Sequence, residues 1–193
     1  MAVSSTMLKL QTPAPDFSLP DVMSGRTVSL SDFKDKKALL VMFICRHCPY
    51  VQHVKSELAK IGKDYKDKDI GIVAISSNDI EAYPEDGPKS LAEMAKEEGF
   101  DFSYLFDETQ EVAKSYTAAC TPDLFLFDKD RKLVYRGQID DSRPGSNIEV
   151  TGKDLRAAID AVLEGKAVNP NQKPSMGCSI KWKKGNEPDY FKG

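Results

Sequence analysis

The sequence predicts an α/β fold in which a mixed central β-sheet is flanked by helices. Residues 39–44 form a continuous apolar run, which is typical of a strand buried on both faces. Residues 51–65 then place apolar side chains at helical spacing, and residues 70–76 form a second apolar run. Together these three segments predict a right-handed strand–helix–strand unit.

The remaining segments extend this unit in both directions. Residues 13–33 predict two short strands around a turn, as an N-terminal extension before the buried strand. After the second strand comes a polar, proline-bearing loop over residues 77–88, in which no functional residue is predicted. The elements expected beyond it are a helix at 89–98, a strand at 104–106, a helix at 108–116, strands at 124–127 and 133–136, and a helix at 151–163.

The C-terminal segment has a different character. Its prolines and glycines prevent long regular structure, yet it contains large apolar side chains that favour burial. We therefore expect one domain over residues 1–165, including the N-terminal extension, and an ordered tail over residues 166–193 packed on it.

Length, charge and composition narrow the functional classes. The chain has 193 residues and 40% hydrophobic content, enough for one domain with an extension. The net charge of −3 gives no electrostatic signature of nucleic-acid binding, and no apolar run is long enough for a membrane span. The beginning of the chain lacks an apolar secretion signal, and four cysteines do not suggest a disulfide scaffold, so we expect a cytoplasmic protein.

A pair of cysteines ends the first predicted strand. Cys45 and Cys48 are separated by two residues, and because proline is tolerated in the first turn of a helix, Pro49 indicates that a helix begins near Arg46. One helical turn would bring the two sulfur atoms together, so a disulfide could open and close locally. We expect Cys45 to be the attacking thiolate and Cys48 the resolving thiol, with Arg46 and His47 lowering the thiol pKa.

Two other interpretations of the cysteine pair are a structural zinc half-site and two inert core thiols. Structural zinc sites usually have a second Cys/His pair, and none follows at a suitable spacing. We therefore predict neither a metal nor another cofactor. A further alternative is a protein that binds Cu(I) or Zn²⁺ through Cys45, Cys48 and His47.

Several stretches resemble a known superfamily. Residues 43–49 (Phe-Ile-Cys-Arg-His-Cys-Pro), followed by an amphipathic helix, resemble the active site of the thioredoxin superfamily. Residues 14–20 (Ala-Pro-Asp-Phe-Ser-Leu-Pro) are similar to the entry segment of its peroxiredoxin and ResA-type branch. Residues 121–127 resemble the cis-proline loop, and residues 176–182 resemble the tail of an AhpC/TSA-like, peroxiredoxin-like group. Without the tail, these stretches together cover roughly residues 12–163, the extent of approximately one domain.

The resemblance implies a fold, an activity and a substrate class. It implies a thioredoxin-like fold in which Pro122 is cis and lies against the cysteines, with the Thr121 backbone available to pair with an incoming peptide. An ordinary strand entry is the alternative for this Thr-Pro pair. The implied activity is thiol–disulfide oxidoreduction on a protein or low-molecular-weight disulfide or thiol, by a monomer or weak dimer.

A thiol peroxidase is the main alternative function. Cys45 or Cys48 would become a sulfenic acid that the neighbouring thiol resolves. Peroxiredoxins, however, carry a threonine or serine three residues before the reactive cysteine, and Met42 occupies that position relative to Cys45. The local sequence thus lacks the hydroxyl group that would orient a peroxide.

Two further cysteines lie outside the pair. Cys120 is two residues before Pro122, and Cys178 lies in the tail. We expect at least one of them to lie near Cys45 and Cys48 and to exchange with them. The alternative is that both are small buried apolar residues. The sequence identifies no proton acceptor for Cys48.

Overall fold

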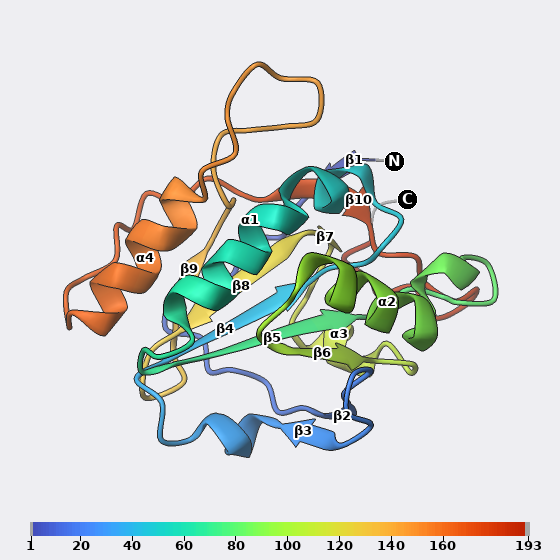
Figure 1. Ribbon diagram of the computed structural model, residues 1–193, viewed down its shortest axis with the longest axis horizontal. Helices are drawn as coiled ribbons and strands as arrows, with labels where there is room; N and C mark the ends of the chain where they lie inside the picture. Colours follow the sequence, from blue (N-terminus) through green and yellow to red (C-terminus); the bar gives the residue numbers. More distant parts are fainter. Residues whose placement is uncertain (1, 192–193) are drawn as a thin grey trace.

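The computed structural model describes residues 2–191 and has a five-stranded mixed sheet at its centre (Figure 1). Its middle strand is β4 (Ala38–Phe43), which pairs in parallel with β5 (Ile70–Ser76) and antiparallel with β8 (Asp123–Phe127). The outer strands are β6 (Ser103–Phe106), parallel to β5, and β9 (Leu133–Arg136), antiparallel to β8. The predicted α/β, thioredoxin-like fold class is confirmed.

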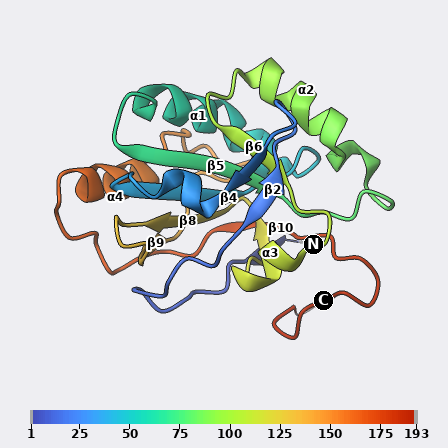
Figure 2. The ribbon, with the colours of Figure 1, turned by 90° about the horizontal axis from the view of Figure 1, so that it is seen from below.

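Helices cover both faces of the sheet. The helices α1 (Pro49–Tyr65), α2 (Pro88–Glu98) and α4 (Lys153–Leu163) contribute buried side chains to one core cluster. The short α3 (Glu111–Ser115) lies on the opposite face with the N-terminal segment and the tail (Figure 2).

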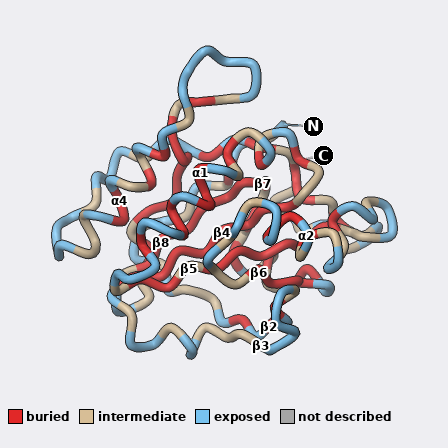
Figure 3. The backbone as a smooth tube through the Cα atoms, in the orientation of Figure 1, coloured by how far each residue is buried: buried red, intermediate tan, exposed pale blue. Residues whose placement is uncertain are grey.

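The central strand is buried on both faces, as its apolar run predicts. Leu40 and Met42 belong to the core cluster under α1, whereas Leu39 and Val41 belong to the cluster on the other face. Side chains that alternate along a strand point to opposite faces, so an uninterrupted apolar run is required here. Figure 3 shows the buried strands enclosed by helices whose outer surfaces are exposed.

Two smaller sheets accompany the central five-stranded sheet. The predicted N-terminal extension is an antiparallel hairpin of β2 (Ser18–Pro20) and β3 (Thr27–Ser29), followed by the 3₁₀ helix η1 (Leu30–Phe33). The other sheet has the strand order β1-β10-β7 and was not predicted. Its strands are β1 (Ala2–Ser4), β10 (Met176–Ser179) and β7 (Cys120–Thr121).

The β1-β10-β7 sheet joins both ends of the described chain to the strand that precedes Pro122. The division into residues 1–165 and 166–193 stays an interpretation, and residues 1, 192 and 193 lie outside the described residues. None of the helices within residues 2–191 combines the length and apolar character that crossing a bilayer requires.

A buried ion pair fixes the beginning of β8. The side chains of Asp123 and Arg136 are both completely buried, and Arg136 Nη2 lies 3.1 Å from Asp123 Oδ2. The guanidinium group also stacks on Phe125, 4.2 Å from the ring centroid, and donates to Thr117 and Thr6. Because the charges neutralise each other in a low-dielectric interior, neither partner is dispensable.

Replacing Asp123 tests this pair. Asp123→Ala leaves the Arg136 charge buried without its carboxylate, so we expect the free energy of unfolding to fall by about 3–5 kcal/mol in urea titrations. The matched control is Asp130→Ala, which removes one partner of the exposed Lys129–Asp130 pair and should cost less than about 1 kcal/mol. Equal losses from both variants would show that burial does not govern these interactions.

Candidate functional site: a buried pair of thiols

The two cysteines lie where β4 leads into α1. The helix begins at Pro49 and Cys48 is its N-cap residue, so the expected start near Arg46 is wrong by one turn. The reason lies in a distant carboxylate: Asp86 Oδ1 accepts the backbone N–H groups of Arg46 at 2.8 Å and His47 at 3.1 Å. Those two N–H groups therefore bind the Asp86 side chain, and their residues do not form the first turn of the helix.

Both thiols are in contact with the cis-proline loop. Cys45 and Cys48 are fully buried, and the Thr121–Pro122 peptide bond is cis, as the resemblance implies. Cys45 Sγ lies 3.3 Å from Thr121 Oγ1, and Cys48 Sγ lies 3.1 Å from the Thr121 carbonyl oxygen. One residue of the loop thus contacts both sulfur atoms.

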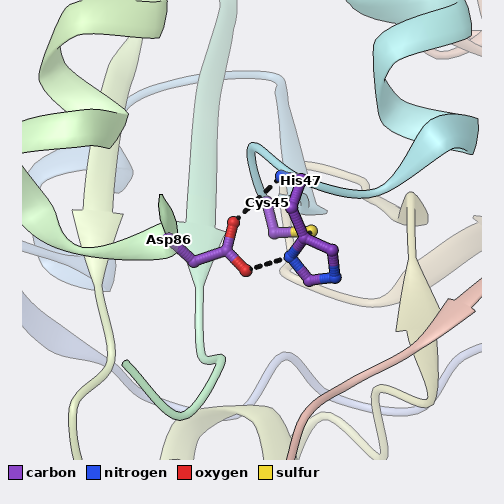
Figure 4. Close-up of side chains that lie close together, drawn as sticks. All are labelled: Cys45, His47 and Asp86. Carbon is purple, nitrogen blue, oxygen red and sulfur yellow. Dashed lines mark hydrogen bonds and ion pairs between the residues drawn. The ribbon is translucent and has the colours of Figure 1, made fainter. Parts of the chain in front are cut away.

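Asp86 lies beside His47 and Cys45 (Figure 4). Its buried carboxylate accepts hydrogen bonds from the Asn78 amide at 2.8 Å and from the Nδ1 of His47. The same Nδ1 lies 3.9 Å from Cys45 Sγ, and the imidazole ring stacks on Tyr83 with 5.0 Å between ring centroids. Asp86 therefore fixes His47 beside Cys45.

The sequence interpretation missed Asp86. This residue ends the 3₁₀ helix η2 (Pro84–Asp86), inside the loop for which no function was predicted. No local spacing distinguishes it from the loop's other carboxylates, Asp79, Glu81 and Glu85. Only the tertiary fold brings it to the cysteine pair.

Arg46 has a different position from the one expected. Its guanidinium group donates to the backbone oxygen of Ser90 at 2.6 Å and forms an ion pair with Glu93 at 3.1 Å. Both partners belong to α2, so the charge is neutralised there and not beside the sulfur atoms. The expectation that the Arg46 charge lowers the thiol pKa is corrected accordingly, and Arg46 instead fixes the motif to α2.

Of the two thiols of the pair, Cys48 is the one whose pKa is lowered. A hydrogen bond from Cys45, together with weaker ones from Cys178, Thr121 and the backbone N–H of Val51, lowers the pKa of Cys48 to about 4 despite its burial. The hydrogen bond to Cys48, burial and the Asp86 carboxylate raise the pKa of Cys45. These directions favour a thiolate on Cys48, whereas the sequence-based assignment of the attacking thiolate to Cys45 stays a prediction.

One contact opposes the lowering of the Cys48 pKa. The Thr121 carbonyl oxygen can only accept a hydrogen bond, so its position 3.1 Å from Cys48 Sγ favours a proton on Cys48. The two thiols therefore ionise as a pair in which one proton is shared, and the lowered pKa describes the first ionisation of that pair.

The backbone of Thr121 is already paired. Residues Cys120–Thr121 form β7, which pairs antiparallel with β10 in the register Cys178 to Thr121. The approach is so close that a Cβ atom on Gly177 would overlap the Thr121 carbonyl group. The expectation that Thr121 is available to an incoming peptide is therefore wrong for this conformation, since the protein's own tail occupies that edge.

The register separates the two remaining cysteines. Paired residues of antiparallel strands project to the same face, so Cys178 lies on the face of Thr121, and it packs against the core cluster that contains Cys45 and Cys48. Cys120 pairs with Ser179 on the alternate face, and its thiol donates to the Pro122 carbonyl oxygen at 3.5 Å. All four thiols are free. Cys178 is thus the third thiol of the site, whereas Cys120 is a buried residue beside it.

The residues of the site also offer a set of metal-donor atoms. Cys45, His47 and Asp86 each contribute one such atom, and these lie within 4.8 Å of one another. This set differs from the expected one, because Asp86 replaces Cys48. The Nδ1 of His47 is hydrogen-bonded to Asp86, so a metal ion would have to displace that hydrogen bond to bind there.

The shared proton can be tested by ultraviolet absorbance of the thiolate as a function of pH. In the reduced protein we expect about one thiolate at about pH 6, lost as the pH falls through about 4, because the first ionisation of the pair is lowered. A free thiol with a pKa of about 8.5 would be almost fully protonated at about pH 6.

Single substitutions assign that thiolate. Cys48→Ser should remove the low-pH signal, because the pKa of Cys45 is raised by burial and by Asp86. Cys120→Ser is the control and should leave the titration unchanged. A wild-type signal that appears only above about pH 8 would contradict the lowered pKa.

Comparison with known proteins agrees with this geometry. The chain is 26% identical over 129 residues to the thiol-disulfide oxidoreductase ResA of Bacillus thuringiensis, a match covering 66% of this chain and 68% of ResA. Among solved structures it resembles an uncharacterized conserved protein from Geobacillus kaustophilus, with 56% identity, a TM-score of 0.93, and coverage of 95% of this chain and 97% of the other. A hypothetical protein from Sinorhizobium meliloti gives 50% identity, a TM-score of 0.92, and coverage of 94% and 99%.

The family assignment rests on the core of the domain. The model of the AhpC/TSA family matches residues 10–136, a range that contains the sheet from β2 to β9, Cys45, Cys48 and the cis-proline loop. With this match and the fold, the chain belongs to the AhpC/TSA family and is a thioredoxin-like redox protein.

Proposed function

We propose that this protein is a thiol–disulfide oxidoreductase that cycles between a Cys45–Cys48 dithiol and disulfide. The observation that carries the proposal is the pair of buried thiols at the N-terminus of α1, both in contact with Thr121 of the cis-proline loop. A thiolate that persists below neutral pH is the form that attacks a disulfide. The similarity to ResA supports the same activity.

The proposed reaction has two exchange steps. The Cys48 thiolate attacks one sulfur of the substrate disulfide, which forms a mixed disulfide and releases the other substrate sulfur as a thiolate. Cys45 then attacks Cys48, forms the Cys45–Cys48 disulfide and releases the second substrate thiol. The proton that Cys45 gives up passes to the leaving sulfur, and the Asp86 carboxylate, which has an oxygen within 4.8 Å of Cys45 Sγ, is positioned to accept it on the way.

The class of substrate that we favour depends on how a disulfide can reach the two sulfur atoms. Both sulfur atoms are buried, and β10 covers the backbone edge of Thr121 where a peptide would pair. A low-molecular-weight disulfide needs no such edge, whereas a protein disulfide would have to displace β10. We therefore favour small disulfides as substrates in this conformation.

A thiol peroxidase is the second candidate, and one contact favours it. The hydroxyl group missing from the local sequence is supplied by Thr121, whose Oγ1 lies 3.3 Å from Cys45 Sγ. A thiolate of the pair would attack a peroxide oxygen, break the O–O bond, become a sulfenic acid and release the other oxygen as water or an alcohol. The other thiol would then form the disulfide and release water.

Activity assays on matched substrates separate these functions. We expect the reduced protein to reduce glutathione disulfide faster than it reduces either insulin disulfides or hydrogen peroxide. Cys48→Ser should lower this activity by at least about 100-fold and Cys45→Ser by at least about 10-fold, because they remove the nucleophile and its resolving partner.

The matched control for these variants is Cys120→Ser, which removes a buried thiol outside the pair and should stay within about twofold of the wild type. If Cys48→Ser retained wild-type disulfide reduction, the proposed function would be abandoned. If peroxide were the faster substrate, the peroxidase would replace it.

A further inference from the structure

We propose that Cys178 is a third redox-active cysteine, which exchanges with Cys48 and transfers the disulfide between the buried pair and thiols outside the protein. The proposal rests on the redox cycle of Cys45 and Cys48 described above. The first observation is the position of the tail: its strand β10 pairs with β7 beside Thr121 and contains Cys178.

The tail holds Cys178 at the site by contacts on both sides. Before it, Ser175 Oγ donates to the Pro122 carbonyl oxygen at 2.6 Å. After it, the backbone N–H of Lys181 donates to the Asn78 side chain at 2.9 Å. The same Asn78 amide donates to Asp86, so the tail is attached to the residues that surround the thiol pair.

Register and burial distinguish Cys178 from Cys120. Cys178 projects to the face of Thr121, the residue that contacts both sulfur atoms, and packs against the core cluster that contains Cys45 and Cys48. It is also partly exposed, whereas Cys45 and Cys48 are fully buried. Among the four cysteines, Cys178 is therefore the residue that combines packing against the pair's core cluster with partial exposure to solvent.

The state of Cys48 controls the reactivity of Cys178. In the reduced protein, burial and the hydrogen bond with Cys48 raise the pKa of Cys178 to about 11, and the Cys48 charge contributes to the increase. Once Cys48 is part of a disulfide, its negative charge is gone and only burial still opposes ionisation. Cys178 thus becomes easier to ionise when there is a disulfide for it to attack.

The exchange needs no additional oxidant. The Cys178 thiolate attacks Cys48 in the Cys45–Cys48 disulfide, the Cys48–Cys178 bond forms, and Cys45 leaves as the thiolate that takes up the proton lost by Cys178. A low-molecular-weight thiol then attacks Cys178 from solvent, forms a mixed disulfide and releases Cys48. A second such thiol resolves it, so that two external thiols become one disulfide and the protein returns to the reduced state.

Disulfide mapping of the Cys45→Ser protein tests the proposal without an activity assay. After reaction with glutathione disulfide and an acid quench, we expect more than about half of the protein to contain Cys48 joined to Cys178, without a retained glutathione adduct. In Cys45→Ser/Cys178→Ser the adduct should remain on Cys48. In the matched control Cys45→Ser/Cys120→Ser the Cys48–Cys178 bond should form as before.

A second variant tests the geometry and leaves every thiol in place. Gly177→Ala in the Cys45→Ser protein places a Cβ atom against the Thr121 carbonyl group and should displace β10, so the yield of the Cys48–Cys178 bond should fall several-fold. Met176→Ala is the control, because this exposed side chain lies on the same strand and its loss should leave the yield unchanged.

The outcomes separate this inference from the proposed function. A stable glutathione adduct on Cys48 beside a free Cys178 in the Cys45→Ser protein would overturn the role of Cys178 alone. Oxidised wild-type protein that contains no Cys45–Cys48 disulfide, even transiently, would instead overturn the redox cycle itself.

Discussion

The antiparallel pairing of β10 with β7 is the constraint on which the site depends. It brings a tail segment from more than 50 residues further along the chain against Thr121, the residue whose hydroxyl and carbonyl groups contact the two sulfur atoms. The thiol pair is buried because the tail completes the site. In this family member the backbone edge next to the cis-proline is therefore part of the folded domain and not an open binding surface.

In the site that the tail completes, Cys45 and Cys48 share one proton, and the hydrogen-bonding groups around them determine where it lies. Cys45 faces the Asp86 carboxylate, and Cys48 receives hydrogen bonds from its neighbours and from the first turn of α1. Charges that would be screened in water act strongly at these distances in a buried site. The site is consequently governed by which groups donate and accept, and the formal charge of Arg46, neutralised on α2, has little influence on it.

The sequence was sufficient for the sheet and for the position of the cysteine pair, and the reason is local. The apolar run of β4, the helical spacing of α1 and the Cys-x-x-Cys motif are all patterns within about 30 residues, where periodicity is informative. Asp86 and the β10 pairing depend on tertiary contacts between residues about 40 to 60 positions apart, which no single-sequence pattern encodes.

The assignment of the thiolate to Cys45 rests on two local signals that the structure places elsewhere. A helix N-terminus and an adjacent arginine favour a low pKa at the first cysteine, and both signals are visible in the sequence. The helix in fact begins after Cys48, and the arginine side chain extends to α2. Neither signal therefore acts on Cys45 as predicted, and the thiol pKa shifts arise from hydrogen bonds, burial and the Asp86 carboxylate.

Gly177 gives this arrangement a use in classifying related chains. Because a Cβ atom at this position would overlap the Thr121 carbonyl group, the tail can follow this path only if the residue is glycine. A related chain with a larger residue there cannot keep this close approach of the tail to the cis-proline loop without a shift of the backbone. The residue at this one position therefore tests whether a relative can enclose its thiol pair in the same way.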